Sequence, residues 1–150
     1  TEALAIRATV AALTGTLADA LMAALDAMDS AALDVDAGGV DAAHREFHAL
    51  LISGAGRRFS TVSSTLWDHT VRYRVAAISG AGDMGEFLME AQADHGRILE
   101  AVVMRDGDAA AAALGRHYER TARTLIAASE PEHDPVLLDA AIAAALGWRA

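Results

Sequence analysis

Leucine and valine side chains recur at a spacing of three or four residues from Val10 to Leu25. Because an α-helix has 3.6 residues per turn, this spacing places them on one helix face. The whole chain is rich in alanine, leucine and arginine, with 2 prolines and 5% aromatic residues. Such residues favour helix over strand. We therefore expect an all-α protein whose first helical stripe consists of Leu4, Val10, Leu13, Leu17, Leu21 and Leu25.

Glycine- and aspartate-rich stretches divide the chain into segments of helical length. Asp83 is placed to cap one helix, and Asp134 with Pro135 forms a cap and first position for the last one. The pattern predicts a single domain over residues 1–150, an antiparallel bundle of about six helices that encloses a cavity for a metal or an effector. The expected helices run from about 2 to 29, 40 to 53, 58 to 78, 84 to 104, 108 to 129 and 135 to 146, with a loop over 30–39.

Composition excludes several kinds of protein. The formal charge of −9 argues against nucleic-acid binding by this chain itself, since phosphate binding needs a clustered basic surface. No apolar stretch reaches the 18 or so residues that span a bilayer, and no signal peptide opens the chain. We therefore expect a cytoplasmic protein without a membrane partner. The chain contains no cysteine, so a bound metal must be held by imidazole and carboxylate groups.

Four histidines are the candidate functional residues. His44 and His48 lie one helical turn apart, and His95 and His117 lie on apolar faces of two further predicted helices. Buried imidazoles need polar partners, so four of them on inward faces are costly unless they converge on one ion. The alternative is that each is a hydrogen-bonded core residue. The two remaining histidines, His69 and His133, are expected at the surface.

The usual metal-enzyme patterns are absent from the chain. Zinc peptidases need His-Glu-x-x-His, whereas here Glu46 stands one place too late, and no Glu-x-x-His of a di-iron bundle occurs. A small metal-dependent hydrolase that uses an open position on a His-bound ion remains an alternative, but neither Glu46 nor Glu90 is suitably placed as its base. A purely structural dimerisation module is a third interpretation, in which the histidines are coincidental.

Residues from about Arg7 to Leu125 resemble the C-terminal effector-binding domain of FadR-subfamily GntR transcription regulators. That family has an Asp-x-x-Phe-His element, a small-residue turn, an acidic residue and His before an apolar helix, and a final His. The corresponding segments here are His44-Arg45-Glu46-Phe47-His48, Ser53-Gly54-Ala55-Gly56, Asp94-His95 and His117. The resemblance implies a non-enzymatic, homodimeric sensor of a small carboxylate. It also implies that DNA is bound only by a winged helix-turn-helix domain upstream of this chain.

The resemblance also implies a ligand set. His48, His95 and His117 match the three family histidines, while His44 stands where the family has aspartate. With His44 included, four neutral imidazoles favour Zn²⁺, with Ni²⁺ or Co²⁺ as alternatives, over oxygen-preferring ions. If His44 turns away, an open three-histidine site remains. The effector-binding residues expected from the resemblance and from the polar third helix are Arg7, Ser63, Arg72 and Arg74.

Overall fold

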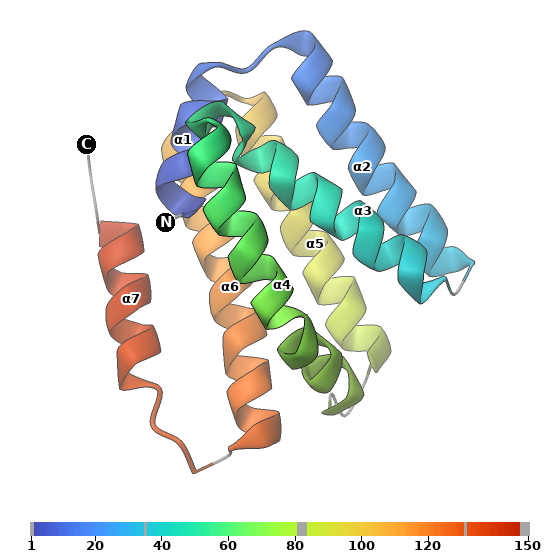
Figure 1. Ribbon diagram of the computed structural model, residues 1–150, viewed down its shortest axis with the longest axis vertical. Helices are drawn as coiled ribbons and strands as arrows, with labels where there is room; N and C mark the ends of the chain where they lie inside the picture. Colours follow the sequence, from blue (N-terminus) through green and yellow to red (C-terminus); the bar gives the residue numbers. More distant parts are fainter. Residues whose placement is uncertain (1, 35, 81–83, 131, 148–150) are drawn as a thin grey trace.

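A computed structural model of the chain describes residues 2–34, 36–80, 84–130 and 132–147; within them, side chains at 72–80, 84–88, 128–129 and 145–147 are not described. The described residues are mostly helical and contain no strand, which confirms the predicted all-α bundle (Figure 1). No described helix is long and apolar enough to cross a membrane. The elements are α1 (Glu2–Ala11), α2 (Gly15–Leu33), α3 (Ala37–Leu51), the 3-10 turn η1 (Ser53–Ala55), α4 (Arg57–Gly80), α5 (Met84–Val103), α6 (Gly107–Ser129) and α7 (Val136–Gly147).

The first expected helix is in fact two, so the described residues hold seven α-helices rather than six. The chain turns between Ala11 and Gly15, where Thr14 caps α2 by accepting a hydrogen bond from the backbone N–H of Leu17. Arg105 donates to the carbonyl oxygen of Leu13 at 2.8 Å and so satisfies a group that the break leaves outside a helix. Leu13 stays buried, which explains why the apolar stripe continues through the turn.

The loop expected over residues 30–39 is also shorter than predicted. α2 continues to Leu33 and α3 begins at Ala37, so both glycines of this stretch lie in the first turn of α3. A Cβ on Gly39 would lie 2.5 Å from a carboxylate oxygen of Asp36 and 3.0 Å from Cβ of Ala31. The glycine therefore serves the close approach of α2 and α3 rather than an extended loop.

The Ser-Gly-Ala-Gly turn after α3 packs directly on α1. A Cβ on Gly54 would lie 2.5 Å from Cα of Thr9, and the backbone N–H of Gly54 donates to Oγ1 of Thr9 at 3.0 Å. Gly56 has a φ of 87°, which favours glycine, and it precedes the first residue of α4. The turn thus fixes where α4 starts relative to α1 and α3.

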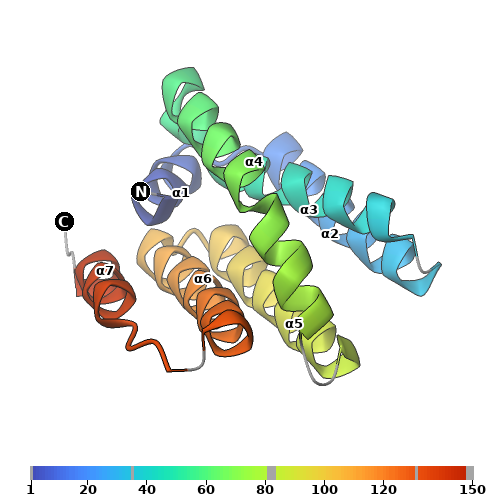
Figure 2. The ribbon, with the colours of Figure 1, turned by 60° about the horizontal axis from the view of Figure 1, so that its bottom comes forward.

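The helices pack in pairs around a shared core. α2 packs along α3, α5 along α6, and α1, α4 and α7 each contact α6 (Figures 1 and 2). Asp106 caps α6 by accepting a hydrogen bond from the N–H of Ala109. α7 begins at Val136, directly after Pro135, which was expected at the first helical position. Asp83, the expected cap of α5, lies outside the described residues. The most deeply buried core side chains are Ile6, Leu21, Phe47, Leu51, Ile98, Val102 and Leu114.

Candidate metal centre

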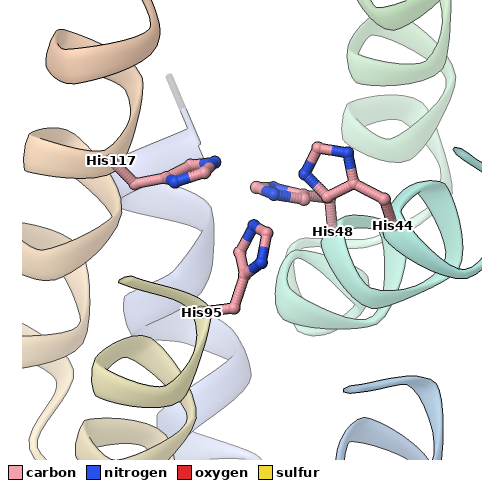
Figure 3. A group of neighbouring side chains, drawn as sticks. All are labelled: His44, His48, His95 and His117. Atoms are coloured by element: carbon pink, nitrogen blue, oxygen red, sulfur yellow. The ribbon is translucent and has the colours of Figure 1, made fainter. Parts of the chain in front are cut away.

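The four histidines singled out from the sequence converge on one point (Figure 3). α3 contributes His44 and His48, α5 contributes His95, and α6 contributes His117. One ring nitrogen of each residue lies within 4.8 Å of the corresponding nitrogen of every other. Three helices therefore bring four imidazoles to a single small volume.

Helical geometry accounts for this placement. His44 and His48 are four residues apart, so both leave the same face of α3, with ring centroids separated by 4.7 Å. His95 faces them from α5 at 4.8 Å from the His44 ring, and His117 lies 4.6 Å from the His95 ring. Phe47 is fully buried beside them, with its ring 5.4 Å from His95, and anchors α3 in the core.

Burial keeps two of these imidazoles, His95 and His117, neutral. His48, His95 and His117 each expose 4% or less of their surface, and His44 is half-buried. Burial, together with the neighbouring His117 and His44, lowers the pKa of His95 to about 2. Burial also lowers the pKa of His117 to about 4, although nearby Asp94 opposes this shift. Neutral imidazole is the form that binds a metal, so His95 and His117 are suited as ligands at neutral pH.

The Nδ1 atoms of two of these histidines face oxygen acceptors. The Tyr118 hydroxyl lies 3.0 Å from Nδ1 of His48, and Oε1 of Gln92 lies 3.5 Å from Nδ1 of His95. Gln92 donates its amide N–H to Asp29 on α2, which turns its carbonyl oxygen toward His95. A partner on Nδ1 fixes the tautomer that leaves Nε2 unprotonated, as metal-ligating histidines require.

His117 has a charged neighbour instead. Oδ2 of Asp94 lies 3.8 Å from Nδ1 of His117, and both side chains are almost fully buried. Arg97 contacts the other carboxylate oxygen at 2.7 Å, and Arg120 contacts Oδ2 at 3.2 Å. The two guanidinium groups offset the cost of burying the carboxylate, which can then orient His117.

The donor set fits a tetrahedral metal ion. Nε2 of His95 is completely buried and has no hydrogen-bond partner among the described residues. Such a nitrogen is costly unless it binds something. In a zinc site with Zn–N bonds of about 2.1 Å, ligand atoms lie roughly 3.4 Å apart. Small side-chain rotations close the difference from the observed limit of 4.8 Å.

A cavity of about 60 Å³ adjoins the four-histidine site between α3 and α4. Trp67 of α4 lines this cavity and packs against the site, with its ring 4.9 Å from His44 and 5.3 Å from His48. Arg45 reaches across the cavity to Asp68 at 2.7 Å and to Ser64 at 2.9 Å. The cavity is lined by Arg45, His48, Ala49, Ile52, Ser60, Ser63, Ser64 and Trp67.

The residues expected to bind an effector lie in different places. Ser63 is buried, lines this cavity and donates a hydrogen bond to Glu2. Arg7 is instead bound to Asp108 at 2.7 Å and to the carbonyl oxygen of Ala3 at 2.8 Å, at the junction of α1 and α6. Arg72 and Arg74 belong to α4, but their side chains lie outside the described residues. Effector binding by these residues stays a prediction.

Three carboxylates on α3 and α5 are the candidates for a general base. Glu46 is exposed on α3, and Glu90 lies 3.6 Å from Arg120 in an ion pair. Asp94 contacts two arginines, as described above. None of these three is placed as a general base in the metal-dependent hydrolase that the sequence left open.

Comparison with protein families decides the relationship. The FCD domain family matches residues 2–120 of the chain, from α1 into α6. The chain belongs to the FCD domain family. This confirms the resemblance to the effector-binding domain of GntR-family regulators that the sequence motifs indicated. Comparison with curated proteins found no match, and comparison with solved structures found none either.

Sequence reasoning missed several side chains around the four histidines of this FCD domain. Tyr118 follows His117 directly, and Gln92 precedes His95 by three residues, so each was within one turn of a predicted ligand. Trp67 lies four residues after Ser63, on the same face of α4. These spacings are the signals that were available, but the contacts themselves depend on how the helices pack together.

Proposed function

We propose that this FCD domain is the effector-binding domain of a bacterial transcription regulator and holds a divalent transition metal in a four-histidine site. The convergence of His44, His48, His95 and His117 carries the proposal. Burying imidazoles costs free energy, and apolar residues would fill the same space at a lower cost. Partners on Nδ1 are what metal-ligating histidines require.

Zn²⁺ is the ion that this donor set suits best, with Ni²⁺ or Co²⁺ as the nearest competitors. All four ligands are neutral, because His44 replaces the aspartate expected from the family pattern. When bound, the metal supplies an uncompensated positive charge that attracts an anion. Asp94 does not neutralise this charge, since Arg97 and Arg120 already offset its carboxylate.

A small carboxylate is the effector class that we propose. The neighbouring cavity of about 60 Å³ is far below the roughly 300–1,000 Å³ of pockets for drug-sized ligands, so its occupant has few heavy atoms. Arg45 supplies guanidinium donors at the cavity, which Ser63 also lines, and a guanidinium matches the geometry of a carboxylate. Arg7, Arg72 and Arg74 stay candidates for the same role.

The regulatory output requires a second copy and a DNA-binding domain. We propose a cytoplasmic homodimer in which effector binding shifts the helices that space two upstream winged helix-turn-helix domains. Val62 and Leu66 lie one turn apart on α4 and are 56% and 53% exposed, which supports helix packing by a second copy. Sedimentation of the purified chain at micromolar concentration tests the dimer, and a monomer would contradict this part of the proposal.

Metal analysis tests the site itself. The purified chain is expected to carry about one zinc ion, and the double variant His48→Ala, His95→Ala is expected to lose it. The matched control is His69→Ala with His133→Ala, which removes two exposed histidines and leaves the metal content unchanged. Equal metal content in both double variants would rule out the four-histidine site.

Thermal shift measurements test the effector class. We expect small carboxylates to raise the melting temperature of the zinc-loaded chain more than that of the chelator-treated chain, because ligand binding stabilises the folded state. Neutral amides of the same size are the control. Equal shifts from carboxylates and amides would contradict carboxylate sensing.

A further inference from the structure

A chain of hydrogen bonds leads from the start of α1 to the four-histidine site. Glu2 accepts a hydrogen bond from Ser63 of α4 with one carboxylate oxygen and from Tyr118 of α6 with the other. The Tyr118 oxygen in turn lies 3.0 Å from Nδ1 of His48 on α3. A single carboxylate in the first turn of α1 thus contacts two helices and reaches a predicted metal ligand through one of them.

The direction of this chain follows from counting protons. A tyrosine hydroxyl has one proton to donate, and its oxygen can also accept. Tyr118 donates that proton to the Glu2 carboxylate. The bond between Tyr118 and His48 must therefore be donated by Nδ1–H of the imidazole. Because neutral imidazole carries only one proton, Nε2 of His48, which is completely buried, keeps its lone pair for a ligand bond.

We propose that Tyr118 and Glu2 are positioning residues for His48, so that filling the four-histidine site and docking the first turn of α1 reinforce each other. The inference rests on the proposed metal site. Thermodynamic linkage makes the effect reciprocal: a docked Glu2 favours the His48 tautomer that binds metal, and bound metal favours the docked Glu2.

The connection matters because of where α1 lies. Under the proposed function, the DNA-binding domain precedes α1 in the chain. α1 packs along α6 and contacts η1, so its position depends on elements that surround the site. Its first turn is attached to them through Glu2. Metal binding at His48 would in this way favour the docked position of α1, the helix nearest to that domain.

The first test is the variant Tyr118→Phe, which removes the hydroxyl and keeps the ring. Losing the partner of a metal-ligating histidine lowers metal affinity by about 10- to 100-fold. We expect a loss of this size for zinc, measured by competition with a chromophoric chelator on the full 150-residue chain. Glu2→Ala should weaken zinc binding in the same direction. Glu2→Gln should restore most of it, because the amide oxygen still accepts from Tyr118.

A spectroscopic readout separates positioning from general destabilisation. In the zinc-loaded chain, the Nδ1 proton of His48 is expected as an exchange-protected NMR resonance, lost in Tyr118→Phe while that of His95 persists. Thr9→Val is the matched control: it removes the bond from Gly54 N–H to α1 and lowers stability, yet it should leave zinc affinity unchanged.

Three results would overturn the proposal. The first is that zinc binding and the His48 Nδ1 resonance are the same in Tyr118→Phe as in the unaltered chain. This result would exclude the positioning role but not the metal site. The second is that Thr9→Val weakens zinc binding as strongly as Tyr118→Phe, which would mean that the loss of stability alone weakens zinc binding. Failure of the unaltered chain to bind zinc would overturn this inference and the proposed metal site together.

Discussion

Oδ2 of Asp94 lies 3.8 Å from Nδ1 of His117, and the two side chains are only 6% and 5% exposed. A buried carboxylate beside a predicted metal ligand has a clear physical use, since its charge favours the imidazole orientation that turns Nδ1–H toward it and leaves Nε2 for a metal. Arg97 and Arg120 each contact one carboxylate oxygen and so offset the free-energy cost of burying the charge of Asp94. Asp94 therefore links the surface charges of α5 and α6 to the interior of the site.

Asp94→Asn is expected to weaken zinc binding by about 10- to 100-fold, because the amide is a weaker acceptor for His117 and removes the charge that Arg97 contacts. Isothermal titration with zinc measures the effect. Asp139→Asn is the matched control, since Asp139 forms an ion pair with Arg123 at the surface, away from the histidines. Unchanged zinc affinity in Asp94→Asn would show that the carboxylate does not support His117.

His44→Asp restores the residue that the family pattern places at this position. A carboxylate ligand brings a negative charge and a harder donor atom, so the preference for Zn²⁺ over Mn²⁺ should fall by about tenfold or more. Competition between the two ions, followed by metal analysis, measures the change. His44→Ala is the comparison: it removes a ligand without adding oxygen and should weaken both ions. An unchanged preference in His44→Asp would mean that His44 is not a ligand.

Helical periodicity and the histidine positions were sufficient to predict the fold class and the four-histidine cluster. The cluster was predictable because the position of each histidine on its own helix is enough to indicate it. His44 and His48 share a helix face, and His95 and His117 each lie on an apolar face. The break between α1 and α2 was not predicted, because Leu13 continues the apolar stripe through the turn and is buried there. Thr14 and Gly15 were the available signals for it.

The groups around the histidines were beyond sequence reasoning for a different reason. Tyr118 and Gln92 act through contacts between helices, and such contacts depend on packing distances that no spacing rule gives. The same holds for Glu2, which meets Tyr118 at a separation of 116 residues. A residue's own helix predicts which face it occupies, but not which group it meets there.

Gly54→Ala tests the packing of η1 on α1. The added methyl would lie 2.5 Å from Cα of Thr9, so the backbone must move, and a loss of about 1–3 kcal/mol in the free energy of unfolding is expected. Gly96→Ala is the opposite case. Nothing lies within 4 Å of its Cβ position in the middle of α5, and replacing a helical glycine stabilises by about 0.5–1 kcal/mol. Urea denaturation measures both, and equal effects would contradict the packing described.

Ala49→Leu tests whether the cavity beside His48 holds the effector. The larger side chain should fill much of the space of about 60 Å³ and abolish the stabilisation by small carboxylates. Zinc content should stay the same, because Ala49 is not among the four histidines or their Nδ1 partners. Thermal shift and metal analysis on the same samples measure the two properties. Carboxylate stabilisation that survives in Ala49→Leu would place the effector elsewhere.

Acid sensitivity of the metal-free chain follows from the buried histidines. Burial lowers the pKa of His95 from 6.5 to about 2 and that of His117 from 6.5 to about 4. Below pH 6.5 the unfolded chain therefore binds protons that the folded chain excludes, so stability falls as the pH falls. The loss continues for both residues down to about pH 4, and below it for His95 alone. At pH 5 each contributes a loss of about 2 kcal/mol relative to neutral pH.

Urea denaturation in the presence of a chelator, at pH 7 and at pH 5, measures this loss. His95→Phe removes the larger of the two shifts and should reduce the pH dependence by about half at pH 5. His133→Gln, which alters an exposed histidine, is the control and should keep the full dependence. Saturating zinc should steepen the fall in stability with acid, because protons then compete with the metal for the same nitrogens. A metal-free chain equally stable at both pH values would mean that these imidazoles are not buried in solution.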